Sequence, residues 1–371
     1  MRTARFGAAV SAAVAVLLTG CAAGPAAVPS APDSAPPTTD PTAATPPVAA
    51  ELTGGTALQL GSAGHWAIAD RTAFVASTET GVTAIDLATG DPRWQAGFSL
   101  GEPWEAQPNL GVSADRSVVV AVRTVDAGDA AAVDLLLLDA GSGAKLAEHL
   151  ITDPAGRWRI DLPPRVLAAD RGSVVLADNP ESGRQTAVVD LAAGALAWQV
   201  DDQAVAATTD TVVTRGAGWN RGDGTRRWQA AGPLGPLLAQ SPTALVVQQG
   251  GRAGWLDPAT GNLTSSTADL GEAEPPCVAT ADTLVCLGAQ VTGYDLASAA
   301  ALWTSPGPAD ALAGWGSWLY LWRGDGRGDV LDARTGQPLV TDAALPSLRY
   351  ADDHGVLLSA ENGYSWVSFP G

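Results

Sequence analysis

Apolar and polar residues alternate in short runs along most of the chain from Glu51 onward. Residues 82–85, 186–189 and 291–294 have the period-two pattern of half-buried β-strands, and each run ends at an Asp that opens a Gly-containing turn. Almost no stretch in this region has helical periodicity. The pattern therefore predicts an all-β fold made of short strands and tight turns.

The strands and turns repeat as one motif, in which an Asp is followed by a Gly after four residues and by a Trp after four more. The first copy consists of Asp86, Gly90 and Trp94. The six further copies are Asp139/Gly143, Asp190/Gly194/Trp198, Asn220/Gly224/Trp228, Asp257/Gly261, Asp295/Trp303 and Asp332/Gly336. Ala299 replaces the Gly of the sixth copy, and the missing Trp positions hold Ala147, Ser265 and Val340. The copies lie 30 to 53 residues apart, and about 37 in the later part of the chain, a spacing that belongs to repeat architectures.

Each position of the motif has a physical reason. The Asp accepts hydrogen bonds from amides of the hairpin loop, and the Gly takes the left-handed conformation that closes the turn. The Trp falls on the next, outermost strand, where its ring can fill the gap between neighbouring sheets while the indole N–H finds a backbone carbonyl. The motif therefore predicts small sheets that dock side by side.

The motif resembles the tryptophan-docking motif of the pyrroloquinoline-quinone-like β-propeller repeats. This is the family of the quinoprotein dehydrogenases and of the outer-membrane assembly lipoprotein BamB. Residues 84–94 match the family motif at every characteristic position, and weaker copies extend the resemblance from about Thr56 to the C-terminus. The resemblance implies a propeller scaffold, which enzymes and non-enzymes of the family share.

The number of strands predicts an eight-bladed propeller, since blades average about 40 residues. Seven blades carry the motif, and residues 348–351, 355–359 and 364–369 form the last one. This blade lacks an outer strand, which residues 56–60 can supply to close the ring. Seven blades are the alternative, if residues 215–229 form only an embellished hairpin.

The N-terminal region predicts export and lipidation. Residues 1–20 have the basic start and short apolar run of a signal peptide, which ends in a sequence resembling the bacterial lipobox before Cys21. Cleavage there would leave Cys21 to carry a diacylglycerol and fatty acids such as palmitate; an ordinary secretory signal with an incidental Cys is the alternative. Residues 21–50 are a Pro- and Ala-rich disordered linker, and residues 51–371 are the propeller. We therefore expect an extracytoplasmic protein, lipid-anchored to a bacterial cell membrane.

The charge of the chain restricts its partners. It has 21 Lys and Arg against 39 Asp and Glu, a net charge of −18. Nucleic acid and anionic lipid headgroups would be repelled by such a protein. We therefore expect no nucleic-acid partner, and we expect the membrane to be reached only through the lipid on Cys21.

The two remaining cysteines are predicted to pair. A hairpin that turns at residues 281–282 places Thr280 opposite Thr283 and hence Cys277 opposite Cys286, at a non-hydrogen-bonded position where the strands lie closest. Outside the cytoplasm such a pair forms a structural disulfide. Two free buried thiols are the alternative.

The sequence offers little support for catalysis. The quinoprotein dehydrogenases that the motif resembles use the quinone with a calcium or lanthanide ion, an Asp base and, in many, a disulfide of adjacent cysteines. No two cysteines are adjacent here, and the ion ligands have no matching positions. The three histidines, His65, His149 and His354, are scattered without the spacing of metal ligands. We therefore expect no cofactor and no metal; pyrroloquinoline quinone with calcium remains the alternative.

Two tryptophans outside the motif are candidate binding residues. Trp104 and Trp158 fall in the insertions 99–111 and 151–165, where an exposed ring would suit the anchoring of a partner. By contrast, strand alternation puts Trp318, Tyr320 and Trp322 on one face, as expected for packing between blades.

Three functions are therefore open. The first is a surface-tethered, non-catalytic propeller that binds a protein partner or a cell-envelope component. The second is an oxidoreductase that uses pyrroloquinoline quinone. The third is a small-ligand or carbohydrate-binding protein, with Trp104 and Trp158 as its platform.

Overall fold

The computed structural model describes the C-terminal unit of the chain. All described residues fall within the compact unit Pro46–Gly371. They are 56–58, 60, 65–78, 81–99, 108–126, 131–152, 163–178, 185–240, 245–269, 277–280, 282–288, 290–305, 309–323, 326–345, 348–352, 355–360 and 363–368.

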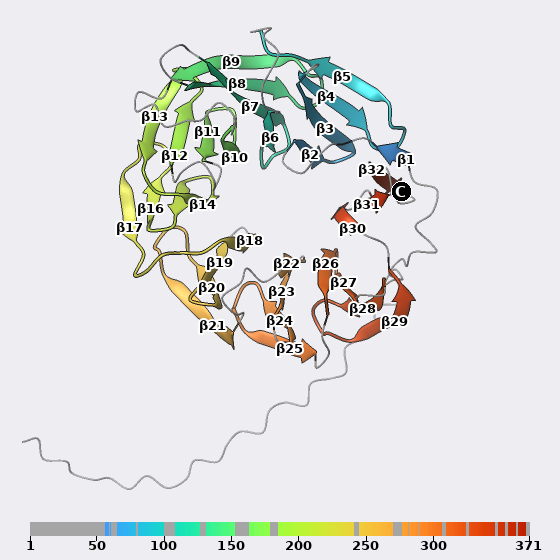
Figure 1. Ribbon diagram of the computed structural model, residues 1–371. Helices are drawn as coiled ribbons and strands as arrows, with labels where there is room; N and C mark the ends of the chain where they lie inside the picture. Colours follow the sequence, from blue (N-terminus) through green and yellow to red (C-terminus); the bar gives the residue numbers. More distant parts are fainter. Residues whose placement is uncertain are drawn as a thin grey trace, which may run out of the picture. The chain divides into compact units, whose positions relative to one another are not determined.

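Thirty-two strands form eight four-stranded antiparallel sheets, which follow one another around a ring as the blades of a propeller (Figure 1). Blades 1 and 2 are β2 (Trp66–Ala69), β3 (Thr72–Ser77), β4 (Gly81–Asp86), β5 (Pro92–Ala96), and β6 (Asn109–Val112), β7 (Val118–Asp126), β8 (Ala131–Asp139), β9 (Lys145–Thr152). Blades 3 and 4 are β10 (Arg165–Ala169), β11 (Ser173–Ala177), β12 (Thr186–Asp190), β13 (Ala195–Val200), and β14 (Ala204–Ala207), β15 (Thr211–Thr214), β16 (Ala217–Asn220), β17 (Arg226–Gln229).

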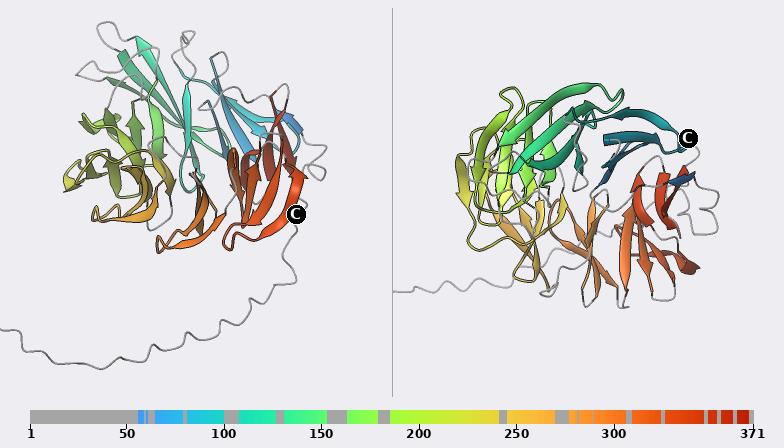
Figure 2. Two further views of the ribbon diagram at one scale, coloured as in Figure 1. Left: turned by 60° about the horizontal axis from the view of Figure 1, so that its bottom comes forward. Right: turned by 45° about the horizontal axis from the view of Figure 1, so that its top comes forward.

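The second half of the ring is built in the same way, and in both views of Figure 2 the blades keep their chain order. Blades 5 and 6 are β18 (Leu237–Gln240), β19 (Leu245–Gln249), β20 (Arg252–Leu256), β21 (Leu263–Asp269), and β22 (Cys277–Ala279), β23 (Thr283–Leu287), β24 (Val291–Asp295), β25 (Ala301–Ser305). Blades 7 and 8 are β26 (Ala311–Trp315), β27 (Trp318–Trp322), β28 (Arg327–Asp332), β29 (Pro338–Ala344), and β30 (Leu348–Asp352), β31 (Gly355–Ala360), β32 (Gly363–Ser368), β1 (Thr56–Leu58).

The ring is closed by the N-terminal strand, as predicted. Strand β1 pairs antiparallel with β32, with Thr56 opposite Trp366 and Leu58 opposite Tyr364. Blade 8 therefore takes strands from both ends of the described chain, which leaves no open edge between the last blade and the first. The seven-blade alternative is wrong, because residues 215–229 contain β16 and β17, the two outer strands of blade 4.

The core lies between successive blades. Neighbouring side chains of β7 point to opposite faces of blade 2, so Val119 joins the cluster of Phe74 in blade 1 while Val120 joins that of Leu176 in blade 3. All four side chains are at most 1% exposed. The alternating pattern of the sequence thus buries both faces of a blade, one against each neighbour.

The motif turns have the geometry that the sequence predicts. All six motif glycines have positive φ, from 61° at Gly194 to 78° at Gly90, and Ala299 adopts 62° at the same position of the sixth copy. In the first copy the Asp86 carboxylate accepts a 2.9 Å hydrogen bond from the Ala88 amide. Asn220 replaces this acceptor in the fourth copy, where its side-chain oxygen accepts from the Gly222 amide.

Each motif Trp docks on the turn of the following blade. The indole N–H of Trp94 donates to the carbonyl of Ala140, the residue after the motif Asp of blade 2. The ring lies flat on the next glycine, since a Cβ added at Gly143 would come within 2.5 Å of the indole. The same donor and acceptor positions recur in Trp198 to Arg221, Trp228 to Pro258 and Trp303 to Ala333, at 2.9 Å in each case.

Other residues take over where the motif lacks a Trp. Between blades 5 and 6, Trp255 on β20 donates at 3.0 Å to Leu296, again the residue after the motif Asp. Between blades 2 and 3, the ring of His149 rests on Gly194. At the closure, Thr56 donates its hydroxyl to the Ala88 carbonyl of blade 1. At these three junctions the turn of the following blade is kept as the docking surface, while the residue that docks on it changes.

Blades 7 and 8 pack through the aromatic strand β27. Tyr320 is fully buried, and its cluster includes Val356 of blade 8. Trp318 and Trp322 are half-buried against the same cluster. Packing between blades therefore accounts for these rings. In the described part of the chain, no helix is long and apolar enough to cross a membrane.

Replacing a motif glycine should destabilise the ring more than its backbone conformation alone explains. Gly224 has a φ of 69°, and an added Cβ would lie 2.6 Å from Trp198. Gly250 has a φ of 55° with no atom within 4 Å of the added Cβ. Gly250→Ala should therefore lower the free energy of unfolding by about 1–2 kcal/mol, the cost of a left-handed residue. Gly224→Ala should cost about 1–3 kcal/mol more, because the indole must move.

The substitution Ala299→Gly should change the free energy of unfolding in the opposite direction. It removes a left-handed alanine and should stabilise the protein by about 1 kcal/mol. Thermal and denaturant unfolding of the three variants would measure the differences. Equal losses from Gly224→Ala and Gly250→Ala would contradict the docking role of the motif turn.

Candidate functional site

The predicted site residues fall into two groups. Cys21, Trp104 and Trp158 lie outside the residues that the structure describes. The motif residues, together with Cys277 and Cys286, are described, and they belong to turns, blade contacts and a disulfide. The motif therefore supplies architecture, and a site must be sought elsewhere on the propeller.

The antiparallel strands divide the connections between two ends of the propeller. The hairpins between first and second strands share one end with the motif turns between third and fourth strands, and we call this end the motif face. The connections from one blade to the next start and finish at the opposite end, which we call the connection face. The insertions 99–111 and 151–165 are connections of this second kind, on either side of blade 2.

Hydrogen bonds join the ends of the two insertions on the connection face. The Nδ1 atom of His65 lies 3.0 Å from the carbonyl oxygen of Pro108, near the end of the first insertion. The Asn109 side-chain amide donates to the carbonyls of Pro163 and Pro164 at 2.7 and 3.1 Å. The last residues of both insertions are therefore held next to each other.

A buried ion pair supports the start of the first insertion. Arg123 and Asp134 face each other across β7 and β8 with both side chains 1% exposed, and their closest N–O distance is 2.6 Å. Burial raises the pKa of Asp134, although the hydrogen bond and charge of Arg123 oppose this. The Arg123 guanidinium lies 4.3 Å from the ring centroid of Phe98. The following residue, Ser99, donates its amide and hydroxyl to Glu148.

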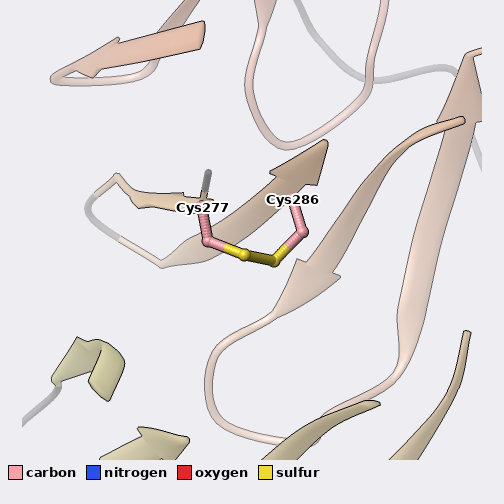
Figure 3. The surroundings of a disulfide bond; sticks show 2 residues. All are labelled: Cys277 and Cys286. Atoms are coloured by element: carbon pink, nitrogen blue, oxygen red, sulfur yellow. A yellow bond between two sulfur atoms is a disulfide. The ribbon is translucent and has the colours of Figure 1, made fainter. Parts of the chain in front are cut away.

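The disulfide joins Cys277 on β22 to Cys286 on β23 (Figure 3). The two residues are opposite each other in the register, 4.1 Å apart at Cα, and the Thr280 amide donates to the Thr283 carbonyl at the turn. Cys286 is buried among the residues that pack blade 5 against blade 6. The bond therefore staples a hairpin of blade 6, and the alternative of two free thiols is wrong for this structure.

Salt bridges between blades recur on the motif face. Arg116 of blade 2 lies 2.5 Å from Asp70, at the first hairpin of blade 1. Arg221 of blade 4 lies 2.7 Å from Asp170, at the equivalent hairpin of blade 3. In the same way, Arg334 of blade 7 reaches Asp282 of blade 6 at 2.6 Å.

The buried member of this set is Arg221, which opens the triplet Arg221-Gly222-Asp223. Its side chain is only 7% exposed, and burial lowers its pKa, which the charges of Asp170 and Asp210 oppose. Its guanidinium also donates to Ser173. The triplet therefore has a role in packing, although it looks like an integrin-binding signal.

One groove on the motif face has the character of a binding site. It has a volume of about 380 Å³ at the junction of blades 1 and 2. Its lining includes Arg71 from the β2–β3 hairpin, Arg93 from β5 and Arg116 from the β6–β7 hairpin, with Asp70 as the only lining acid. The groove thus carries an excess of positive charge in an acidic protein.

No local feature of the sequence points to this groove. Its arginines lie in separate turns and on an outer strand, and each looks like an ordinary solvated residue in isolation. Arg71 and Arg93 lie together in blade 1, where Arg93 donates to Thr72, and the docking of blade 1 on blade 2 adds Arg116. Within the described ranges, no three His, Cys, Asp or Glu side chains gather in a way that could hold a metal ion.

Comparisons with known proteins identify the fold. No protein-family model matches the chain, and no curated protein matches it. The computationally designed protein Ika8 is similar in structure, with 17% sequence identity, a TM-score of 0.56 and coverage of 85% of this chain and 100% of the designed chain. BamB from Moraxella catarrhalis has 17% identity and a TM-score of 0.54, covering 84% of this chain and 96% of its own. Both likenesses show the propeller fold.

The motif turns should make stability fall in acid. In the motif turn of blade 6, hydrogen bonds from the Ser298 side chain and amide lower the pKa of Asp295 below the ordinary 3.8. In the β6–β7 hairpin, which is not a motif turn, hydrogen bonds from Ser113 and Ser117 lower the pKa of Asp115 to about 2. A carboxyl whose pKa is lower in the folded state than in the unfolded state stabilises the fold at any pH above its unfolded-state pKa. This stabilisation is lost as the pH falls through the folded-state pKa.

The substitution Asp295→Asn tests this expectation with little change of shape, because Asn220 already occupies this position in another copy. The variant should melt below the wild type at neutral pH, and the gap should close as the pH falls below 3.8 and through the lowered pKa of Asp295. Thermal unfolding across this range would measure it, with Asn220→Asp as the reverse change. A gap that does not depend on pH would contradict the role of the charge.

Proposed function

We propose that the protein is a lipid-anchored, extracytoplasmic binding module that docks a protein partner on its connection face and has no catalytic activity. The observation that carries this proposal is the convergence of the two insertions, whose ends are joined by hydrogen bonds from Asn109 to Pro163 and Pro164. The insertions flank one blade and each contains a Trp, a residue type that suits the anchoring of a protein partner.

The rest of the propeller supports a scaffold role. The motif side chains are used in docking one blade on the next, and the indole donors of the motif find carbonyl acceptors inside the ring. The buried pair of Arg123 and Asp134 holds the base of the first insertion. A rigid ring with long connections on one face suits recognition by loops. The fold shared with BamB agrees with this reading, although it shows no partner.

Pyrroloquinoline quinone, the cofactor that the family resemblance raises, does not fit the described residues. A calcium ion at the quinone needs several oxygen ligands around one point, and no such group of acidic side chains occurs among the described residues. The cysteines beyond Cys21 are bonded across a hairpin and are not adjacent in sequence. Saturable, calcium-dependent heat on titration with the quinone would favour the oxidoreductase alternative.

The anchoring part of the proposal predicts the behaviour of Cys21→Ser. Without the thiol no diacylglycerol can be attached, so the variant should leave the membrane fraction and lose the lipid mass, while its propeller remains folded. Membrane fractionation and intact mass spectrometry would measure both effects. Retention of the variant in the membrane after a carbonate wash would contradict lipid anchoring through Cys21.

The docking part predicts where a partner can be cross-linked. A photo-reactive amino acid placed at 104 or 158 should capture a protein in native membranes, and the same residue at 193 should capture none. Position 193 is exposed in a motif turn of blade 3, at the opposite end of the ring. Added wild-type protein should compete for the adduct, and a Trp104→Ala/Trp158→Ala variant should compete poorly. Adducts only at 193, or none at any position, would contradict the proposal.

A further inference from the structure

We propose that the groove between blades 1 and 2 on the motif face is a binding site for a small organic anion. Arg71 and Arg93 would hold the carboxylate or phosphate group of the ligand, and its apolar body would lie on the groove floor. This site is at the opposite end of the propeller from the docking surface of the proposed function, so the two proposals stand or fall separately.

The arrangement of the arginines is the first support. Arg93 donates from Nη1 to the Thr72 hydroxyl at 2.7 Å, which orients the guanidinium while its remaining donors stay available. Arg116 is held by Asp70 at the other side of the groove. No carboxylate of the described residues pairs with Arg71 or Arg93. Two neighbouring guanidinium groups without an internal counterion, one of them oriented by Thr72, suit an anion, which each can bind in bidentate fashion.

The contrast with the other blade junctions is the second support. Where Arg221 and Arg334 lie at equivalent junctions, both are neutralised by aspartates of the preceding blade. At the first junction three arginines face one aspartate, so the lining carries a net positive charge in a protein of net charge −18. This locally positive charge attracts an anionic ligand that the remaining, negatively charged surface repels.

The size and floor of the groove define the rest of the ligand. Its volume of about 380 Å³ falls within the range of small-molecule sites. The floor is formed by Ala69, Phe74 and Ala140, all at most 9% exposed. Phe74 is fixed by the ring of Trp94 at a centroid distance of 5.7 Å. An acid with one aromatic ring or a short branched chain therefore fits better than a bare inorganic ion.

Titration of the purified full-length protein with benzoate and with phenyl phosphate, at constant ionic strength, would test the site. Benzyl alcohol serves as the neutral probe. The wild type should bind at least one of the two anions saturably and the alcohol not at all, and the preferred anion identifies the head group. Binding of neither anion, or equal binding of the alcohol, would overturn the proposal.

The matched variants are Arg71→Gln/Arg93→Gln and Arg171→Gln. Arg171 follows Asp170 in the β10–β11 hairpin just as Arg71 follows Asp70 in the β2–β3 hairpin, but it does not line the groove. The double substitution should weaken binding at least about tenfold, because it removes both charge-assisted contacts. Arg171→Gln should bind like the wild type. Unchanged affinity of the double variant would refute the assignment.

Chemical labelling of the wild-type protein tests the same site without any substitution, so its result does not depend on whether the double variant folds. Phenylglyoxal labels exposed arginines, and peptide mass spectrometry gives the rate at each one. The anion that binds should slow the labelling of Arg71 and Arg93 and leave that of Arg171 unchanged. Equal protection of all three arginines would mean a general salt effect and would also refute the site.

Discussion

The docking of an indole on the turn of the following blade is the contact on which the ring depends. A sheet of four short strands has two faces to bury and cannot form a core alone. The motif turn supplies both parts of this contact: a glycine without a side chain, on which the indole ring lies, and a backbone carbonyl that accepts the hydrogen bond from the indole N–H. Trp94 at Gly143 shows both. Because every blade needs both neighbours, the N-terminal strand must return to the last blade.

The sequence predicted the parts of this structure that depend on near neighbours. The motif turn is fixed within a few residues, so Asp86 and Gly90 could be assigned their roles directly. The pairing of Cys277 with Cys286 followed from counting outward along one hairpin. In both cases the chain itself limits which residues can meet. The closing strand is the exception: β1 pairs with β32 from the other end of the chain, and its position followed from the missing edge of blade 8.

The remaining contacts could not be predicted, because they join residues that are distant in sequence. Trp255 lies one strand earlier than the motif position, and its acceptor is 41 residues away. The groove combines Arg71 and Arg93 of blade 1 with Arg116 of blade 2, which joins them only after the two blades have docked. Nothing in the local pattern distinguishes Arg71 from Arg171, since both follow an Asp in the same type of hairpin.

The difference between Arg71, which lines the groove, and Arg171, which does not, suggests how a repeat scaffold can acquire different surfaces at its blade junctions. The motif fixes the third and fourth strands of a blade, whereas the hairpin between the first and second strands lies beside the next blade without a motif residue in it. Where the facing arginine is matched by acids, as for Arg334 with Asp282 and Asp295, the junction is clamped. Where Arg93 brings a further charge to the same place, the junction has unmatched donors and a groove. The same geometry thus gives a junction closed by ion pairs or one with a positively charged groove, depending on one or two side chains outside the motif.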